Sequence, residues 1–302
     1  ANTTWMNQYE GITTASNDLG QLIYFTSGRI AWDSLGNVIA TDLNEGNEGG
    51  ATKIRGSASQ GIIGVRHPLC PNKYFAITVG DVMGTLEETG YVEFEVDTST
   101  GAITNKPFVG LGLYNTEAIT ATMHRNKLDI WIILHEYGGT NIQAILLKCD
   151  GKFDPPINTD LGPNVDGDGA RGGMAMSYDG KLMAMNYRGG GPTVHRQVML
   201  YDFDNLNGTF DNRRDIVPTG EGVGGYDIIF SQDNKKLYVS GYSAYGDGLV
   251  TFDISSGDEL TIRETMKGGL QPNYGNDQKN IVNLIPNEFR AIEWGADGKL
   301  YL

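Results

Sequence analysis

Four hydrophobic segments of the chain each end in an aspartate that opens a short glycine-containing turn, and they recur at nearly equal distances. The turn-opening aspartates are Asp97, Asp150, Asp202 and Asp253, so the intervals are 53, 52 and 51 residues (150 − 97, 202 − 150 and 253 − 202). A period of this length is typical of folds built from one supersecondary unit that is repeated and stacked. The sequence therefore indicates a repeat architecture.

A second motif is interleaved with the first and has the form of a β-hairpin. Strand-like runs flank a D-G or D-N turn at Asp179, Asp233 and Asp297, and a looser relative, IAWDSLGNVIAT, lies near residue 35. Tight turns of this kind between hydrophobic runs are typical of hairpins. Each repeat thus holds two hairpins, or about four short strands, which is the pattern of a propeller blade.

We therefore predict an all-β fold, a β-propeller of six or seven blades with about four antiparallel strands each and a repeat near 52 residues. The predicted blades cover, in order, residues 20–43, 60–106, 116–158, 172–217 and 224–265, with a further blade starting at 289. We expect residues 1–302 to form a single propeller domain, a fragment or processed part of a longer chain with incomplete blades at both ends. Any helix should be a short piece in a loop.

Composition limits the partners of the chain. Its 42 glycines beside only 10 prolines indicate many tight turns rather than a linker. The formal net charge of −14 argues against nucleic acid and against anionic membrane surfaces, because both require clustered Lys and Arg. No apolar run reaches the length of about 18 residues that a membrane-spanning helix needs. Cys70 and Cys149 are expected to be buried free thiols, with a single disulfide as the alternative.

The stretch LDIWIILHEYGG places His135 and Glu136 at the end of an apolar run, which suggests a zinc protease motif. That motif is H-E-x-x-H on a helix, so its second histidine would fall at position 139. The residue there is Gly139, and the run is apolar at every position from 130 to 134, as in a strand buried on both faces. We expect the His-Glu pair to end a strand and to hydrogen-bond the backbone.

No other catalytic motif is present. The sequence has no G-x-S-x-G elbow, no Walker A loop and no G-x-G-x-x-G in a βαβ setting. The remaining histidines, His67, His124 and His195, have no metal-binding spacing. We therefore expect that the protein is not an enzyme and that it has no cofactor other than a calcium ion.

Candidate binding residues come from the glycine-rich loops. Tyr187, Tyr242, Tyr245 and Tyr274 fall in or beside such loops, where a tyrosine can stack on a sugar or anchor a partner, or can simply pack the rim. Asp166 and Asp168, in NVDGDGARGG, could hold a calcium ion together with backbone carbonyls. The alternative for these two aspartates is a solvated turn, because the fifth position of an EF-hand loop is Ala170 here.

An ordered set of segments resembles one known family across nearly the whole chain. The segments are DLGQLIYFTSGRIAWDSLGNVI, GIIGVRHPLCPNKYFAITV, EAITATMHRNKLDIWIILHEYGGTNIQAILL, YDIIFSQDNKKLYVS and AIEWGADGKLYL. They are similar to the N-terminal propeller region of gliding-motility (SprB-type) adhesins of Bacteroidota and of related surface proteins exported by type IX secretion. The resemblance implies an extracellular location at the outer-membrane surface and provides no catalytic residues.

The function expected from the repeat, the missing motifs and the resemblance is a non-catalytic adhesion or binding module of the cell surface. Its partners would be a surface polysaccharide, another extracellular ligand, or neighbouring domains of the same assembly. Two alternatives stay open. One is a structural part of an extracellular filament or phage appendage, and the other is a propeller enzyme of the lactonase or glycan lyase type.

Overall fold

The computed structural model describes residues 11–27, 30–41, 58–80, 82, 86–188, 197–218, 223–243, 246–268, 281–282, 292–295 and 297–301. The chain divides into two compact units, unit 1 with residues 1–164 and unit 2 with residues 165–302, and each is described by itself. Among the described residues, no helix has the length and hydrophobicity needed to cross a membrane.

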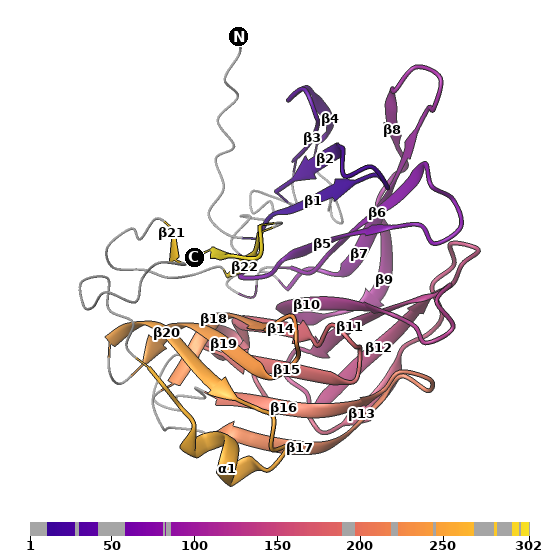
Figure 1. The fold of residues 1–302 in the computed structure, drawn as a ribbon. Helices are drawn as coiled ribbons and strands as arrows, with labels where there is room; N and C mark the ends of the chain where they lie inside the picture. Colours follow the sequence, from indigo (N-terminus) through magenta and orange to yellow (C-terminus); the bar gives the residue numbers. More distant parts are fainter. Residues whose placement is uncertain are drawn as a thin grey trace. The chain divides into compact units, whose positions relative to one another are not determined.

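Unit 1 consists of three antiparallel sheets whose strands follow one another in sequence order (Figure 1). The first sheet contains β1 (Thr13–Ser16), β2 (Leu22–Thr26), β3 (Ile30–Asp33) and β4 (Val38–Thr41). The second contains β5 (Ile62–Arg66), β6 (Lys73–Thr78), β7 (Thr89–Val96) and β8 (Ile103–Asn105), and β9 (Val109–Leu113) also pairs with β7. The third contains β10 (Asn115–Met123), β11 (Ile130–Glu136), β12 (Asn141–Leu147) and β13 (Ile157–Asp160).

Unit 2 repeats this arrangement. One sheet contains β14 (Gly172–Met176), β15 (Leu182–Tyr187), β16 (Gln197–Asp204) and β17 (Thr209–Val217), and the next contains β18 (Val223–Phe230), β19 (Lys236–Ser243) and β20 (Gly246–Asp253). The remaining elements are η1 (Gly167–Ala170), α1 (Glu259–Glu264), β21 (Ile281–Val282), β22 (Glu293–Trp294) and β23 (Leu300–Tyr301). The short helix α1 begins at Asp258, whose carboxylate accepts a hydrogen bond from the backbone N–H of Thr261.

Hydrophobic cores fill the space between the faces of consecutive sheets within each unit. In unit 1, Tyr24 from the first sheet packs on Phe94 from the second, with ring centroids 4.7 Å apart. The opposite face of the second sheet packs on the third through Phe75 and Ile132, both essentially unexposed. Because the middle sheet is covered on both faces, its strand β6 is buried on both sides from Tyr74 to Thr78, as inner blade strands are. Each such side chain contributes about 1.5–3 kcal/mol on burial.

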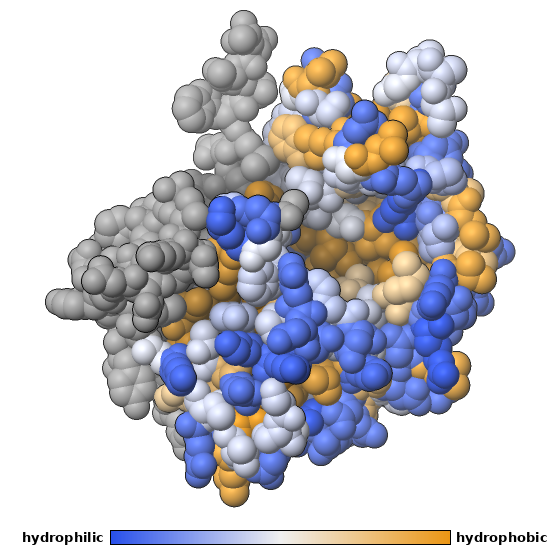
Figure 2. Space-filling model, viewed as in Figure 1, coloured by the Kyte–Doolittle hydropathy of each residue, from blue (hydrophilic) through white to orange (hydrophobic). Residues whose placement is uncertain are grey.

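The surface retains some exposed apolar side chains. Leu35, in the turn between β3 and β4, is 85% exposed, and Val38, the first residue of β4, is 52% exposed. Orange atoms gather over the tips of β3 and β4 in Figure 2. Scattered exposures of this kind are ordinary in soluble proteins.

The all-β prediction is confirmed, and the sheets have the strand order of β-propeller blades. The predicted blade limits lie close to the observed sheets, with one omission: the first sheet starts at β1, Thr13–Ser16, before the predicted start at residue 20. Strand β1 is short and only its Ala15 is buried, so it lacks the hydrophobic pattern of a strand.

One of the four turn-opening aspartates was misplaced. Asp97, Asp150 and Asp253 each accept a hydrogen bond from the backbone N–H two residues on, as expected. In the third of these repeats the position belongs to Asp204, which accepts from Leu206, whereas Asp202 lies inside β16 and pairs with Arg214. The sequence DFD offers two aspartates, and the strand runs two residues further than predicted.

Candidate functional site

The first turn of each sheet is closed by one polar side chain. This side chain belongs to the residue that follows the first strand, and it accepts hydrogen bonds from backbone N–H groups further along the turn. The capping residues of the five sheets are, in order, Asn17, His67, His124, Ser177 and Ser231. Three of these turns belong to unit 1, and two of the three contribute to a pocket.

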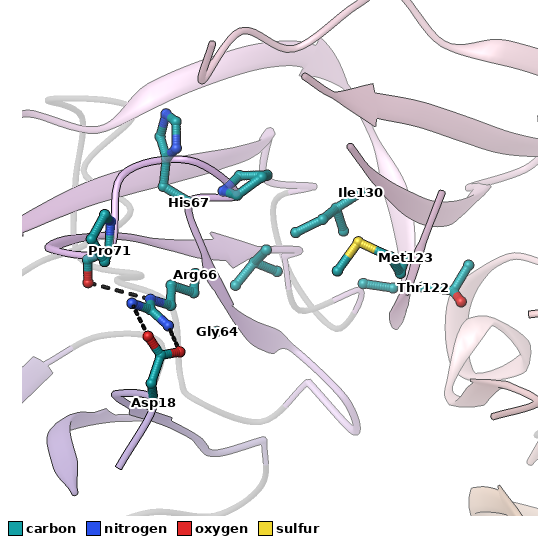
Figure 3. A pocket seen from close by; sticks show the side chains of 11 residues that line it. Asp18, Gly64, Arg66, His67, Pro71, Thr122, Met123 and Ile130 are labelled. Atoms are coloured by element: carbon teal, nitrogen blue, oxygen red, sulfur yellow. Dashed lines mark hydrogen bonds and ion pairs between the residues drawn. The ribbon is translucent and has the colours of Figure 1, made fainter. Parts of the chain in front are cut away.

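The pocket in unit 1 has a volume of about 620 Å³ (Figure 3). Its lining comes from the end of β5, the turn that follows β5, the end of β10, the start of β11, and Asp18 in the first turn of the first sheet. The lining residues are Asp18, Gly64, Val65, Arg66, His67, Pro68, Pro71, Ala121, Thr122, Met123 and Ile130. Segments from three sheets therefore meet at one hollow within unit 1.

One side of the pocket carries an ion pair between Arg66 and Asp18. The two guanidinium nitrogens each donate to one carboxylate oxygen of Asp18, with the Nη2 to Oδ2 distance at 3.0 Å, and Nε donates to the carbonyl of Pro71 at 3.3 Å. The hydrogen bond from Arg66 holds the pKa of the Asp18 carboxyl below its usual range. The pair is solvent-accessible, with side-chain exposures of 27% for Arg66 and 77% for Asp18. It therefore adds little to stability and leaves both charges available to a ligand.

His67 fixes the turn that carries Pro68 and Pro71. Its Nδ1 accepts hydrogen bonds from the backbone N–H groups of Leu69, at 3.2 Å, and Cys70, at 3.1 Å. Its Nε2 faces the backbone at Gly151, where a Cβ would lie only 2.7 Å from Nε2. These partners define a neutral ring protonated at Nε2. Burial, aided by the charge of Lys73, lowers the pKa of His67.

A second group of polar residues in unit 1 is structural. Glu117 is fully buried in β10, and its carboxylate accepts hydrogen bonds from the N–H and hydroxyl of Ser59, both at 2.9 Å, and from the N–H of Val82, at 3.2 Å. Donors from two separate segments thus converge on one buried carboxylate, which satisfies its charge and ties these segments to β10.

The predicted tyrosine site is not assembled in the described part of the chain. Tyr187 is the last residue of β15 and is 0% exposed, so the expectation of a ring exposed on a loop is wrong. The strand continues to this residue and the next sheet covers it. Tyr242 lies in β19, and its side chain is outside the described part, as are Tyr245 and Tyr274 altogether.

The calcium candidates lie at the start of unit 2. Asp166 precedes η1, is exposed, and makes no capping hydrogen bond with its side chain. Asp168 lies within η1, and its side chain is outside the described part. Among the described side chains, no group of three or more His, Cys, Asp or Glu is placed to hold a metal ion.

The His-Glu pair ends a strand, as predicted. His135 is 0% exposed at the end of β11, its carbonyl accepts from Asn115 at 3.2 Å, and its ring packs against Gly162, where a Cβ would lie 2.3 Å from Nε2. Glu136 accepts a hydrogen bond from Asn141 at 2.7 Å. Cys70 and Cys149 are both free, but partly rather than fully buried.

Sequence reasoning did not single out Asp18 or Arg66, and it considered His67 only as one of several scattered histidines. A usable signal exists in the sequence, because the capping residues recur at intervals of 50, 57, 53 and 54 residues (67 − 17, 124 − 67, 177 − 124 and 231 − 177). The residue types Asn, His and Ser differ, however, and only the backbone shows that they hold the same place.

No protein-family model matches the chain, and no curated protein matches it. Solved structures do match in fold. A Bacteroides uniformis protein assigned provisionally as a 6-phosphogluconolactonase is 14% identical, with a TM-score of 0.43 over 97% of this chain and 88% of that one. The periplasmic gluconolactonase of Pseudomonas aeruginosa is 13% identical, with a TM-score of 0.47 over 89% of this chain and 69% of that one. A calcium-binding regucalcin from Agrobacterium tumefaciens is 14% identical, with a TM-score of 0.40 over 83% and 72%.

These comparisons correct the expected function. Two of the three structures bear the names of lactonases, which are enzymes, so the expectations of a non-catalytic adhesion module and of a protein that is not an enzyme are not kept. With identities of 13–14%, the likeness concerns the fold. An activity has to be argued from the residues of this chain.

Proposed function

We propose that this chain is a propeller enzyme of the lactonase type and that the pocket in unit 1 is its reaction site. The observation that carries the proposal is the solvent-accessible Arg66–Asp18 pair set beside an apolar wall in a pocket of about 620 Å³. A carboxylate and a guanidinium at one edge supply a base and a cation. Hydrolysis of a lactone needs both, because water must lose a proton while negative charge builds on the carbonyl oxygen.

The residues would act as follows. The lactone carbonyl oxygen lies against the Arg66 guanidinium, and a water molecule is hydrogen-bonded to a free lone pair of the Asp18 carboxylate. Asp18 takes a proton from that water as its oxygen bonds to the carbonyl carbon, and Arg66 stabilises the resulting oxyanion. The ring C–O bond then breaks, and the leaving alkoxide takes the proton from Asp18. The product is the hydroxy acid, whose carboxylate can accept from an Arg66 N–H group that does not bond Asp18 or Pro71.

Proton release on lactone addition, followed at constant pH, tests this proposal. We expect hydrolysis above the spontaneous rate, and a loss of about 100-fold or more in Asp18→Asn and in Arg66→Gln, since general bases and oxyanion donors each contribute at least that much. Arg213→Gln and Asp215→Asn are the matched controls, because these residues form a similarly exposed ion pair in β17. Equal rates in all four variants, or no rate above background, would refute the proposal.

The number of blades and the length of the repeat are also proposals. We infer six or seven blades with a repeat near 52 residues, supported by the aspartate turns and by the capping residues of the first turns. A crystal structure of the whole protein would count the blades directly.

We also propose that the chain binds calcium and that it is extracellular. Asp166 and Asp168 would bind calcium with backbone carbonyls, and calorimetric titration of chelator-treated protein tests this. An extracellular location with an extracellular ligand rests on the resemblance of the segments to secreted surface proteins, and cell fractionation tests it.

A further inference from the structure

The pocket offers few groups that could bind hydroxyls. Its apolar lining comprises Val65, Pro68, Pro71, Ala121, Met123 and Ile130. Of the polar lining residues, Asp18 and Arg66 face each other, and Nδ1 of the 5% exposed His67 already accepts from two backbone N–H groups. Among the side chains of the described lining, the remaining hydroxyl is that of Thr122, which lies next to Met123 and away from the ion pair. A sugar lactone would bury several hydroxyls there without partners, which costs free energy for each.

Apolar side chains extend beyond the pocket along the same three turns. Leu19 follows Asp18 and is 82% exposed, Leu69 lies between Pro68 and Pro71 and is 57% exposed, and Met123 in the lining itself is 51% exposed. Leu128, in the turn between β10 and β11, is 46% exposed. Exposed apolar side chains gathered on neighbouring turns are a feature of sites for apolar ligands.

The geometry points to a lactone that carries an alkyl chain as the substrate class of this pocket, an inference that rests on the proposed lactonase function. Figure 3 shows Met123 and Ile130 across the pocket from the Arg66–Asp18 pair. The ester group would lie against the ion pair, and the alkyl chain would cover Val65, Met123 and Ile130 and then reach the exposed leucines. Polyhydroxylated sugar lactones would be poor substrates.

A series of γ-lactones with growing alkyl chains, from γ-butyrolactone to γ-dodecalactone, tests the inference, with δ-gluconolactone as the polar comparison. Each methylene buried against Val65, Met123 and Ile130 should raise kcat/KM by about fourfold. The rise should level off when the chain has filled the pocket. A flat series, or a kcat/KM for δ-gluconolactone above that of γ-decalactone, would overturn the inference while leaving lactonase activity in place. No hydrolysis of any lactone would instead overturn the proposed function.

Two variants distinguish a loss of apolar contact with the alkyl chain from a general loss of stability. Met123→Ser removes apolar surface from the lining and should lower kcat/KM for γ-decalactone by about tenfold, because several methylene contacts are lost. The same variant should change kcat/KM for γ-butyrolactone by less than about twofold, since that ring has no chain to bind. Leu206→Ser is the matched control, because Leu206 is 50% exposed, much like Met123, and lies in unit 2 outside the pocket lining. Equal losses for both lactones in Met123→Ser would contradict the assignment.

Discussion

The turn between β5 and β6 and the turn between β18 and β19 have the same construction but different capping residues. In the first, Nδ1 of His67 accepts from Leu69 and Cys70. In the second, the hydroxyl of Ser231 accepts from Lys235, at 3.2 Å, and from Lys236, at 2.9 Å. Both capping side chains are at least 92% buried, since His67 is 5% exposed and Ser231 is 8% exposed. The backbone requires an acceptor at this place and accepts an imidazole or a hydroxyl.

The difference is that the imidazole of His67 can take up a proton as the pH falls, whereas the hydroxyl of Ser231 cannot. The charges facing His67 are Lys73 on β6, Glu93 on β7 and Asp150 in the turn after β12; burial and Lys73 lower the pKa of His67, while Glu93 and Asp150 oppose them. Protonation would place a hydrogen on Nδ1, facing two N–H donors. We therefore expect the turn that holds Pro71, whose carbonyl accepts from Arg66, to be pH-sensitive and the Ser231 turn not to be.

The largest expected effect comes from His67→Leu. This substitution removes the acceptor for two partly buried backbone N–H groups, and we expect the free energy of unfolding to fall by about 2–3 kcal/mol. Urea denaturation at pH 8 measures this. His67→Asn is the matched variant, since Asn17 holds the same place in the first sheet, and it should recover most of the loss. If the Leu variant is as stable as the Asn variant, the cap is not what holds the turn.

Ser231→Ala should have a smaller effect of about 1 kcal/mol, because the hydroxyl is the acceptor for two N–H groups but leaves little space when removed. The comparison predicts that this loss is the same at pH 8 and pH 5. Denaturation at both values checks it. A loss that changes between them would show that the second turn also depends on a group that titrates in this range.

The pH dependence of the wild-type protein should come from the first turn. Because the pKa of His67 is lowered in the fold from its usual value of 6.5, the turn contributes its full stability above that value and loses it as the pH falls further. The hydrogen bond from Ser231 lowers the pKa of Asp233, so the second turn should be affected only below the usual value of 3.8. From pH 8 to pH 5 the amide hydrogen exchange of Leu69 and Cys70 should slow down less than the intrinsic rate does, because their protection is lost. Unchanged protection would contradict this.

Asn17→Ala should have the smallest effect, about 0.5–1 kcal/mol, since Asn17 caps a more exposed turn by accepting from Leu19 and Gln21. Denaturation at pH 8 measures it. Because Asp18 follows directly, we also expect a weaker lactonase rate in this variant. A normal rate with reduced stability would indicate that the ion pair, rather than the cap, positions Asp18.

Much of the fold could be predicted from the sequence because blade strands repeat a local pattern. The run from Ile130 to Glu136 and the D-G and D-N turns are short-range features, and they lie where expected. Strand β1 was missed, because its pairing with β2 depends on a partner rather than on its own four residues.

The candidate site could not be predicted in the same way. Asp18 and Arg66 are 48 residues apart and have no motif between them. Their pairing follows from the packing of one sheet on the next. Tyr187 illustrates the opposite error, since the glycines after it suggested a loop while the strand buries its ring completely.

The most direct test of the central claim is a crystal structure of the protein with 4-hydroxydecanoate, the product of γ-decalactone hydrolysis. We predict the carboxylate on the Arg66 guanidinium beside Asp18, and the alkyl chain along Met123 and Ile130. A ligand bound elsewhere in the molecule, or an empty pocket at saturating concentration, would contradict the assignment of this pocket as the reaction site.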